Sequence, residues 1–85
     1  MSGSVLDSPD FASLVVQGMN PSVQRVYSLL RFGRMMKVGE IEEETRYSDR
    51  TVRKALAKLR KLALIEKVPD MYDLRSHYYV AIAAA

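Results

Sequence analysis

The stretch that decides the fold is Ser48-Asp49-Arg50-Thr51-Val52-Arg53-Lys54-Ala55-Leu56-Ala57-Lys58-Leu59-Arg60-Lys61-Leu62. Ser48 can accept a hydrogen bond from a free backbone N–H at the start of a helix. Apolar residues then recur at spacings of four, three and four, at Val52, Leu56, Leu59 and Ala63, with Ala55 and Leu62 at the edges. Because each residue turns a helix by roughly 100°, these side chains share one side. The pattern therefore predicts a helix that buries one face.

The opposite side of this predicted helix is basic. It carries Arg50, Arg53, Lys54, Lys58 and Lys61. A packed helix that exposes this much positive charge can lie in the major groove of DNA and neutralise phosphates. The alternative is an ordinary amphipathic helix with a solvated face, and the residues on either side of the helix favour the DNA-binding interpretation.

Charge is unevenly distributed along the chain. The 85 residues suit one domain, and a hydrophobic content of 48% with 27% charged residues is typical of a globular protein. The net charge is only +3, but residues 50–61 carry six Lys or Arg and no acid, whereas residues 40–44 carry four Glu and no base. This separation predicts that one surface meets an anionic partner.

Several function classes are disfavoured by composition. The chain has no cysteine, which excludes disulfides, thiolate metal sites and cysteine nucleophiles. Residues 1–10 lack the basic and apolar regions of a signal peptide, and no apolar run is long enough to cross a membrane, so we expect a cytoplasmic protein with no membrane partner. His77 has no second His or Cys at ligand spacing. With no phosphate loop and no nucleophile–base pair, we expect neither an enzyme nor a cofactor, and no small-molecule ligand is evident.

Further elements are predicted on both sides of the basic helix. Asn20-Pro21 is a strong helix start, with Gly33 as its end. The remaining predicted elements are a short helix at 10–16, a small strand at 36–38, a short helix at 40–46, a strand at 64–68 and a strand at 77–82. Pro69-Asp70 is predicted to break the first strand of the closing hairpin, and residues 71–76 are predicted to form its loop.

The segment from Val23 to Ile82 resembles the winged helix-turn-helix family, of the kind found in MarR-like and ArsR-like transcription regulators. The resemblance is carried by Val38-Gly39-Glu40-Ile41, by Ser48 to Leu56, by Leu59 to Ile65 and by the wing from Val68 to Tyr79. It implies an α+β, mainly helical fold with a three-helix core, a C-terminal β-hairpin wing and an additional N-terminal helix. The motif spacing is fairly specific for the fold but poorly specific for function, because the same fold also serves in protein interaction.

The resemblance also implies roles for individual residues. The recognition helix, residues 48–62, would enter the major groove through its N-terminal half. Ser48, Arg50, Thr51 and Lys54 would then approach bases and flanking phosphates, whereas Arg53, Lys58 and Lys61 would serve phosphates. In the wing, residues 69–77, Arg75 is the candidate for the minor groove or backbone, helped by Ser76 and His77. The alternative for Arg75 is a solvated loop cation paired with Asp73.

Two positions depart from the family pattern. Many members have glycine where Arg46 and Ala63 stand. A left-handed conformation at Ala63 would cost on the order of 1 kcal/mol. If Ala63 does not adopt this conformation, the helix continues slightly beyond it and the position of the wing shifts.

The expected organisation is an N-terminal tail or short helix at 1–19, followed by a winged helix-turn-helix domain at 20–85. Apolar residues around Phe11, Leu14 and Val15 are available for a homodimer contact, or they pack on the chain's own core. The expected function is sequence-specific binding of double-stranded DNA by a small, homodimeric transcription regulator. The alternatives are a protein-interaction module of a transcription or replication complex and a non-specific chromosomal DNA-binding protein.

Overall fold

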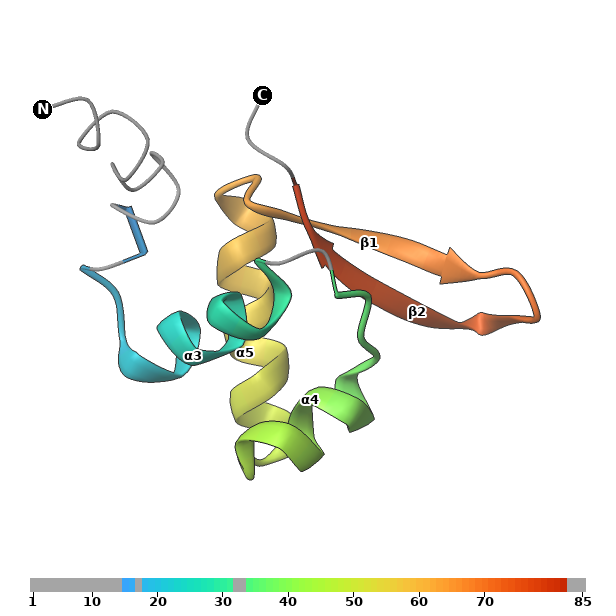
Figure 1. Cartoon of the computed structure of the whole chain (residues 1–85), viewed down its shortest axis with the longest axis horizontal. Helices are drawn as coiled ribbons and strands as arrows, with labels where there is room; N and C mark the ends of the chain where they lie inside the picture. Colours follow the sequence, from blue (N-terminus) through green and yellow to red (C-terminus); the bar gives the residue numbers. More distant parts are fainter. Residues whose placement is uncertain (1–14, 17, 32–33, 83–85) are drawn as a thin grey trace, which may run out of the picture.

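A computed structural model of the chain describes residues 15, 16, 18–31 and 34–82. Its elements run in the order α3 (Pro21–Leu30), α4 (Val38–Thr45), α5 (Asp49–Lys61), β1 (Ile65–Asp70) and β2 (Asp73–Ala81). The helices pack together and the hairpin projects from them as a wing (Figure 1). The predicted winged helix-turn-helix fold is confirmed. The short helix predicted at 10–16 falls mostly outside the described residues.

Helix α3 begins where the sequence predicts. Asn20 accepts a hydrogen bond from the Ser22 backbone N–H at 3.1 Å, and Pro21 occupies the first helical position, where its missing N–H costs nothing. The helix buries Val23, Val26, Tyr27 and Leu30. It ends at Leu30 with Arg31 as its C-cap, and the predicted end at Gly33 lies outside the described residues.

Helix α4 begins two residues earlier than its predicted start at Glu40. The Lys37 backbone N–H donates to the Glu40 carboxylate at 2.8 Å, and this bond closes the first turn at Val38. The predicted strand at 36–38 is therefore wrong beyond its first residue. Met36 forms an isolated bridge, donating to the Tyr79 carbonyl at 3.1 Å and accepting from the Tyr79 N–H at 2.8 Å.

The turn between α4 and α5 needs a left-handed residue, and Arg46 supplies it with φ 64°. Its backbone N–H donates to the Glu42 carbonyl at 2.8 Å, which ends α4. Two residues later Ser48 caps α5, because its Oγ accepts from the Thr51 N–H at 3.2 Å. The sequence prediction of a capped helix at this point is confirmed.

Helix α5 ends in a Schellman motif. The Ala63 N–H donates to the Arg60 carbonyl at 2.9 Å, and the Leu64 N–H donates to the Leu59 carbonyl at 3.0 Å. Ala63 adopts φ 59°, so the chain accepts the left-handed cap without glycine. The helix does not run on. The expectation that Ala63 extends the apolar stripe is wrong, because its side chain is exposed beyond the last helical turn.

The wing is a tighter hairpin than the sequence predicts. Pro69 does not break β1 but pairs with His77, and only Met71 and Tyr72 form the turn. Each strand of a two-stranded sheet has one free edge, and a proline is tolerated where its nitrogen faces that edge. The register shifts between Pro69 and Asp70, which lets Asp70 pair with Asp73. The loop predicted at 71–76 is therefore mostly strand.

One core joins the helices to the root of the wing. Its most deeply buried large side chains are Val26, Leu30, Ile41, Val52, Leu56 and Leu59. Ile65 and Tyr79 extend it into the hairpin. Truncating one of these leucines to alanine would cost about 2–5 kcal/mol. None of the helices in the described part of the chain has the length and apolar character needed to cross a membrane.

Candidate nucleic-acid interface

The exposed face of α5 carries the predicted cations. Val52, Ala55, Leu56 and Leu59 face the core, so the other side of the helix points to solvent. All five predicted cations are exposed there: Arg50, Arg53, Lys54, Lys58 and Lys61. Arg53 pairs with Asp49 one turn earlier, with Nε 2.8 Å from Oδ1. The other four have no ion-pair partner among the described residues.

Two of the predicted contact residues also build the helix. Ser48 Oγ accepts from the Thr51 backbone N–H and donates to Thr51 Oγ1 at 3.0 Å. These hydroxyls therefore order the first turn of α5. Arg50 lies in the same turn, and its side chain is exposed.

The exposed face of α5 is flanked by two hollows. The first is a groove between α5 and the residues that lead into α3. Thr51, Lys54, Lys58 and Lys61 line it on one side, and Met19, Asn20, Ser22 and Val23 line it on the other. Apolar atoms form most of its lining, and three of the lining residues are lysines. The structure thus brings four of the predicted site residues together along one side of α5.

The second hollow is a cleft between α5 and the wing. Arg53 from the helix and Arg75 and Ser76 from β2 line it, together with Lys37, Lys67 and His77. Two separately predicted sets, one on the recognition helix and one in the wing, therefore meet at this cleft. The predicted residues divide between the two hollows, except Ser48 and Arg50, which line neither.

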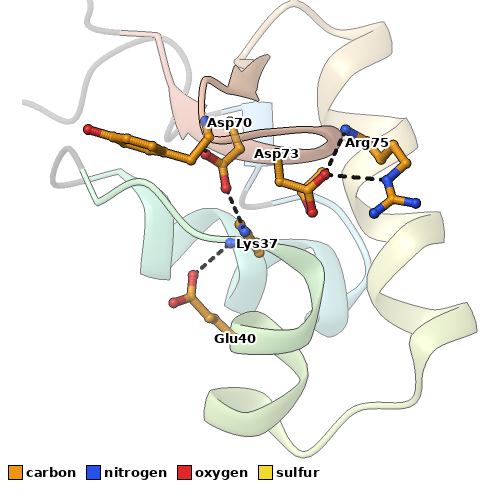
Figure 2. Close-up of polar contacts among 7 residues, drawn as sticks. Lys37, Glu40, Asp70, Asp73 and Arg75 are labelled. Carbon is orange, nitrogen blue, oxygen red and sulfur yellow. Dashed lines mark hydrogen bonds and ion pairs between the residues drawn. The ribbon is translucent and has the colours of Figure 1, made fainter.

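Asp73 holds the predicted wing residues in place. Its Oδ1 accepts from the Arg75 backbone N–H at 3.2 Å and lies 3.5 Å from Arg75 Nε (Figure 2). The Ser76 hydroxyl donates to Oδ2 at 3.2 Å. The pairing with Asp73 that the sequence left as an alternative is present. It leaves the Arg75 side chain 95% exposed, so the guanidinium stays open to an external anion.

Lys37 is a residue of the cleft that the sequence did not single out. Its Nζ lies 2.8 Å from Asp70 Oδ2, which joins the start of α4 to the end of β1 (Figure 2). The hydrogen bond from Lys37 lowers the pKa of Asp70, and a further hydrogen bond from the Tyr72 backbone N–H lowers it again. The same hydrogen bond to Asp70 raises the pKa of Lys37. Lys37 also lies 5.1 Å from the centre of the Tyr78 ring.

Lys67 is the second cation of the cleft that the sequence analysis omitted. It lies on β1 opposite Tyr79. Side chains alternate along a strand, which puts Lys67 on the same face as the buried Ile65, so the strand pattern did not indicate that Lys67 is exposed. Lys37 had no local signal either, because its role depends on a contact with Asp70, 33 positions later in the chain.

The acidic residues of α4 lie beside the basic helix. Glu43 and Glu44 are exposed. Glu42 is half-buried and its pKa is raised, first by a hydrogen bond with Asp49 at the start of α5 and then by burial. Two carboxyl groups this close repel when both are ionised. No group of three or more His, Asp or Glu side chains in the described ranges is arranged to hold a metal ion.

Comparison with known proteins places this geometry among solved winged helix structures. ZitR from Lactococcus lactis matches 75% of this chain with a TM-score of 0.71 and 23% identity, over 43% of its own length. YusO from Bacillus subtilis matches 82% of the chain with a TM-score of 0.71 and 24% identity, over 50% of its own length. The adhesin competence repressor AdcR from Streptococcus pyogenes matches 95% with a TM-score of 0.70 and 16% identity, over 56% of its own length.

The likeness is one of fold, and the chain spans about half the length of these solved structures. No family model matches the sequence, and no curated protein matches it. The resemblance to MarR-like winged helix proteins is therefore carried by the arrangement of the helices and the wing.

Proposed function

We propose that this chain is the DNA-binding domain of a transcription regulator and that it recognises a specific double-stranded sequence. The observation that carries the proposal is the solvent face of α5, where four cations have no ion-pair partner among the described residues. A rigid helix with this face matches the width of the major groove. AdcR, whose structure resembles this chain, is named as a repressor, which supports a regulatory function for this chain.

The N-terminal half of α5 reads bases in this proposal. Arg50 and Lys54 leave the first turns of the helix, and either side chain can bind guanine O6 and N7. Ser48 and Thr51 hold that turn in place and lie beside the flanking phosphates. Base contacts then provide the sequence preference, and the remaining cations provide affinity.

The two hollows receive the phosphate backbone on either side of α5. Lys58 and Lys61 line the groove next to α3, and Arg53 and Lys67 line the cleft next to the wing. Arg75, aligned by Asp73, points a nearly fully exposed guanidinium towards the adjacent minor groove or its phosphates. Ser76 takes part as a hydrogen-bond donor at the same edge.

We further propose that the regulator is a homodimer that acts in the cytoplasm. Two copies would present their α5 helices about 34–36 Å apart and read a palindrome. The contact is assigned to the apolar residues around Phe11, Leu14 and Val15, within the N-terminal unit 1–19 that precedes the domain at 20–85.

Selection from a random duplex library tests the central proposal. We expect one enriched motif, and we expect the Arg50→Ala/Lys54→Ala double variant to lose the preference for it. Each bidentate base contact discriminates by about 1–3 kcal/mol, so the double variant should bind the selected and scrambled duplexes with similar affinity. The matched control is Arg25→Ala/Arg34→Ala, which removes two exposed charges that line neither hollow.

Other outcomes identify the alternatives. Tight, salt-sensitive binding without an enriched motif would mean a non-specific DNA-binding protein. Absence of duplex binding at low salt would contradict the proposal and favour a protein-interaction module. An unchanged sequence preference in the Arg50→Ala/Lys54→Ala variant would contradict the assigned base contacts.

A further inference from the structure

The wing ends in an apolar tip, formed by Met71, Tyr72 and Leu74. Their residue exposures are 78%, 100% and 67%, and they lie within four consecutive positions. The other exposed large hydrophobic residues of the described chain, Met35 and Ile82, are isolated in sequence. Large apolar side chains gathered at the far end of a projecting hairpin indicate a contact surface.

The apolar tip is held in a fixed conformation. The Tyr72 backbone N–H donates to Asp70 Oδ1 at 2.9 Å, and Asp70, itself only 8% exposed, is anchored through Oδ2 to Lys37. On the other strand, Asp73 accepts from the Arg75 N–H and from the Ser76 hydroxyl. The turn is therefore ordered before binding, so little conformational entropy is lost when its side chains bind.

The length of the wing matches the distance to a minor groove. Strand β1 has six residues, and at about 3.3 Å each it spans roughly 20 Å. Half a turn of DNA is about 17 Å. With α5 in the major groove, a hairpin of this length is long enough to reach the neighbouring minor groove.

The cations behind the apolar tip indicate a polyanion as the occupant, because the two carboxylates at the turn, Asp70 and Asp73, are each paired with a cation. Arg75 follows Leu74 directly, and its side chain is almost fully exposed. Lys67 and Arg53 line the cleft at the base of the same side of the wing. Cations arranged behind an apolar end suit a duplex, because they can bind the phosphates that flank the inserted side chains.

Resting on the function proposed above, we propose that the apolar tip is a wedge that inserts into a base step from the minor groove and kinks the duplex. Tyr72 stacks on an exposed base, and Leu74 and Met71 fill the opened step. Pyrimidine–purine steps such as TA and CA/TG unstack most readily. The bound site should therefore contain such a step about half a turn from the bases contacted by α5.

A tryptophan probe tests the wedge directly. The chain has no tryptophan, so Tyr72→Trp places a single indole at the tip and keeps an aromatic side chain there. The probes are a mixed-sequence duplex of about three helical turns that contains TA and CA steps, and a second duplex of equal length without them. We expect the indole emission to be quenched along the binding isotherm measured by anisotropy, more strongly with the first duplex. Met35→Trp, which places an exposed indole outside the wing, should bind without quenching.

A second variant measures the contribution of the wedge. In Tyr72→Ser/Leu74→Ser the substituted side chains are exposed, so the fold should persist. We expect affinity to fall about tenfold, with an unchanged salt slope, because the loss removes stacking and no phosphate contact.

Each remaining outcome contradicts the wedge in a distinguishable way. Binding with unchanged Tyr72→Trp emission would overturn the wedge and leave the proposed function standing. A shift of that emission with protein concentration alone would mean that a second copy covers the tip, and would also overturn it. Failure of both indole variants and the unmodified chain to bind either duplex at low salt would overturn the wedge together with the function.

Discussion

Lys37 Nζ lies 2.8 Å from Asp70 Oδ2, and this ion pair connects the helical body of the domain to its wing. Lys37 also starts α4 through its backbone N–H, which donates to Glu40. Asp70 also fixes the wing turn through the Tyr72 N–H. This pair of side chains therefore holds the wing against the helical body, together with the Met36–Tyr79 bridge and the core.

The pH dependence of stability should report this pair. The lowered pKa of Asp70 adds stability above its ordinary value of 3.8, and that stability is lost as the pH falls through the folded-state value. The raised pKa of Lys37 adds stability that is present below 10.5 and lost as the pH rises through the folded-state value.

Urea unfolding should show that Lys37→Met lowers the free energy of unfolding near neutral pH, and that its difference from the unmodified chain shrinks below about pH 4. Lys67→Met, which lies on the wing but in no ion pair among the described residues, should show no such pH-dependent difference. A constant difference for Lys37→Met at both pH values would contradict the role of the pair.

The contact between Glu42 and Asp49 should act in the opposite direction. The raised pKa of Glu42 means that its contribution to stability is present below its ordinary value of 4.5 and lost as the pH rises through the folded-state value. Glu42→Gln keeps a group that can donate to Asp49 and removes the repulsion. We expect this variant to melt at a higher temperature than the unmodified chain at neutral pH and to lose that advantage in acid. Glu43→Gln, on the exposed face, serves as the control. A lower melting temperature for Glu42→Gln at neutral pH would disprove the repulsion.

The left-handed cap at Ala63 predicts that glycine stabilises the fold. With φ 59° at this position, Ala63→Gly relieves a conformation that costs an L-residue on the order of 1 kcal/mol. Urea denaturation should show a gain of up to that size. The matched control is Ala57→Gly within α5, which should destabilise by about 1 kcal/mol because the residue is helical and exposed. Equal losses in both variants would show that the cap carries no strain.

The proposed homodimer predicts a species of twice the chain mass. Sedimentation at tens of micromolar should detect it, and Phe11→Ser/Leu14→Ser should convert it to a single chain with unchanged unfolding behaviour. A monomer at those concentrations in the unmodified chain would contradict the dimer and the palindromic site.

Local signals in the sequence predicted most of the fold. The caps at Asn20 and Ser48 and the apolar stripe of α5 as far as Leu59 depend on neighbouring residues, and these were confirmed by the structure. The wing was predicted less well. Pro69 and Asp70 are turn-forming residues by composition, but cross-strand pairing with His77 and the contact with Lys37 keep them in β1.

The cations of α5 followed from helical spacing. This spacing places five of them on one face: Arg50, Arg53, Lys54, Lys58 and Lys61. Their division between a groove and a cleft did not follow, because it depends on how α3 and the wing pack beside α5. Residues that join distant segments, such as Lys37, had no local signal.

The most direct test of the central claim is the salt dependence of binding to the selected duplex. If the five cations of α5 and the wing assigned to phosphates bind them, affinity should fall roughly 500-fold between about 50 and 200 mM salt. Lys58→Ala/Lys61→Ala should reduce the slope by about two phosphate contacts and weaken all duplexes alike. A shallow slope in the unmodified chain, or no binding at the lower salt concentration, would contradict the claim that the exposed face of α5 binds DNA.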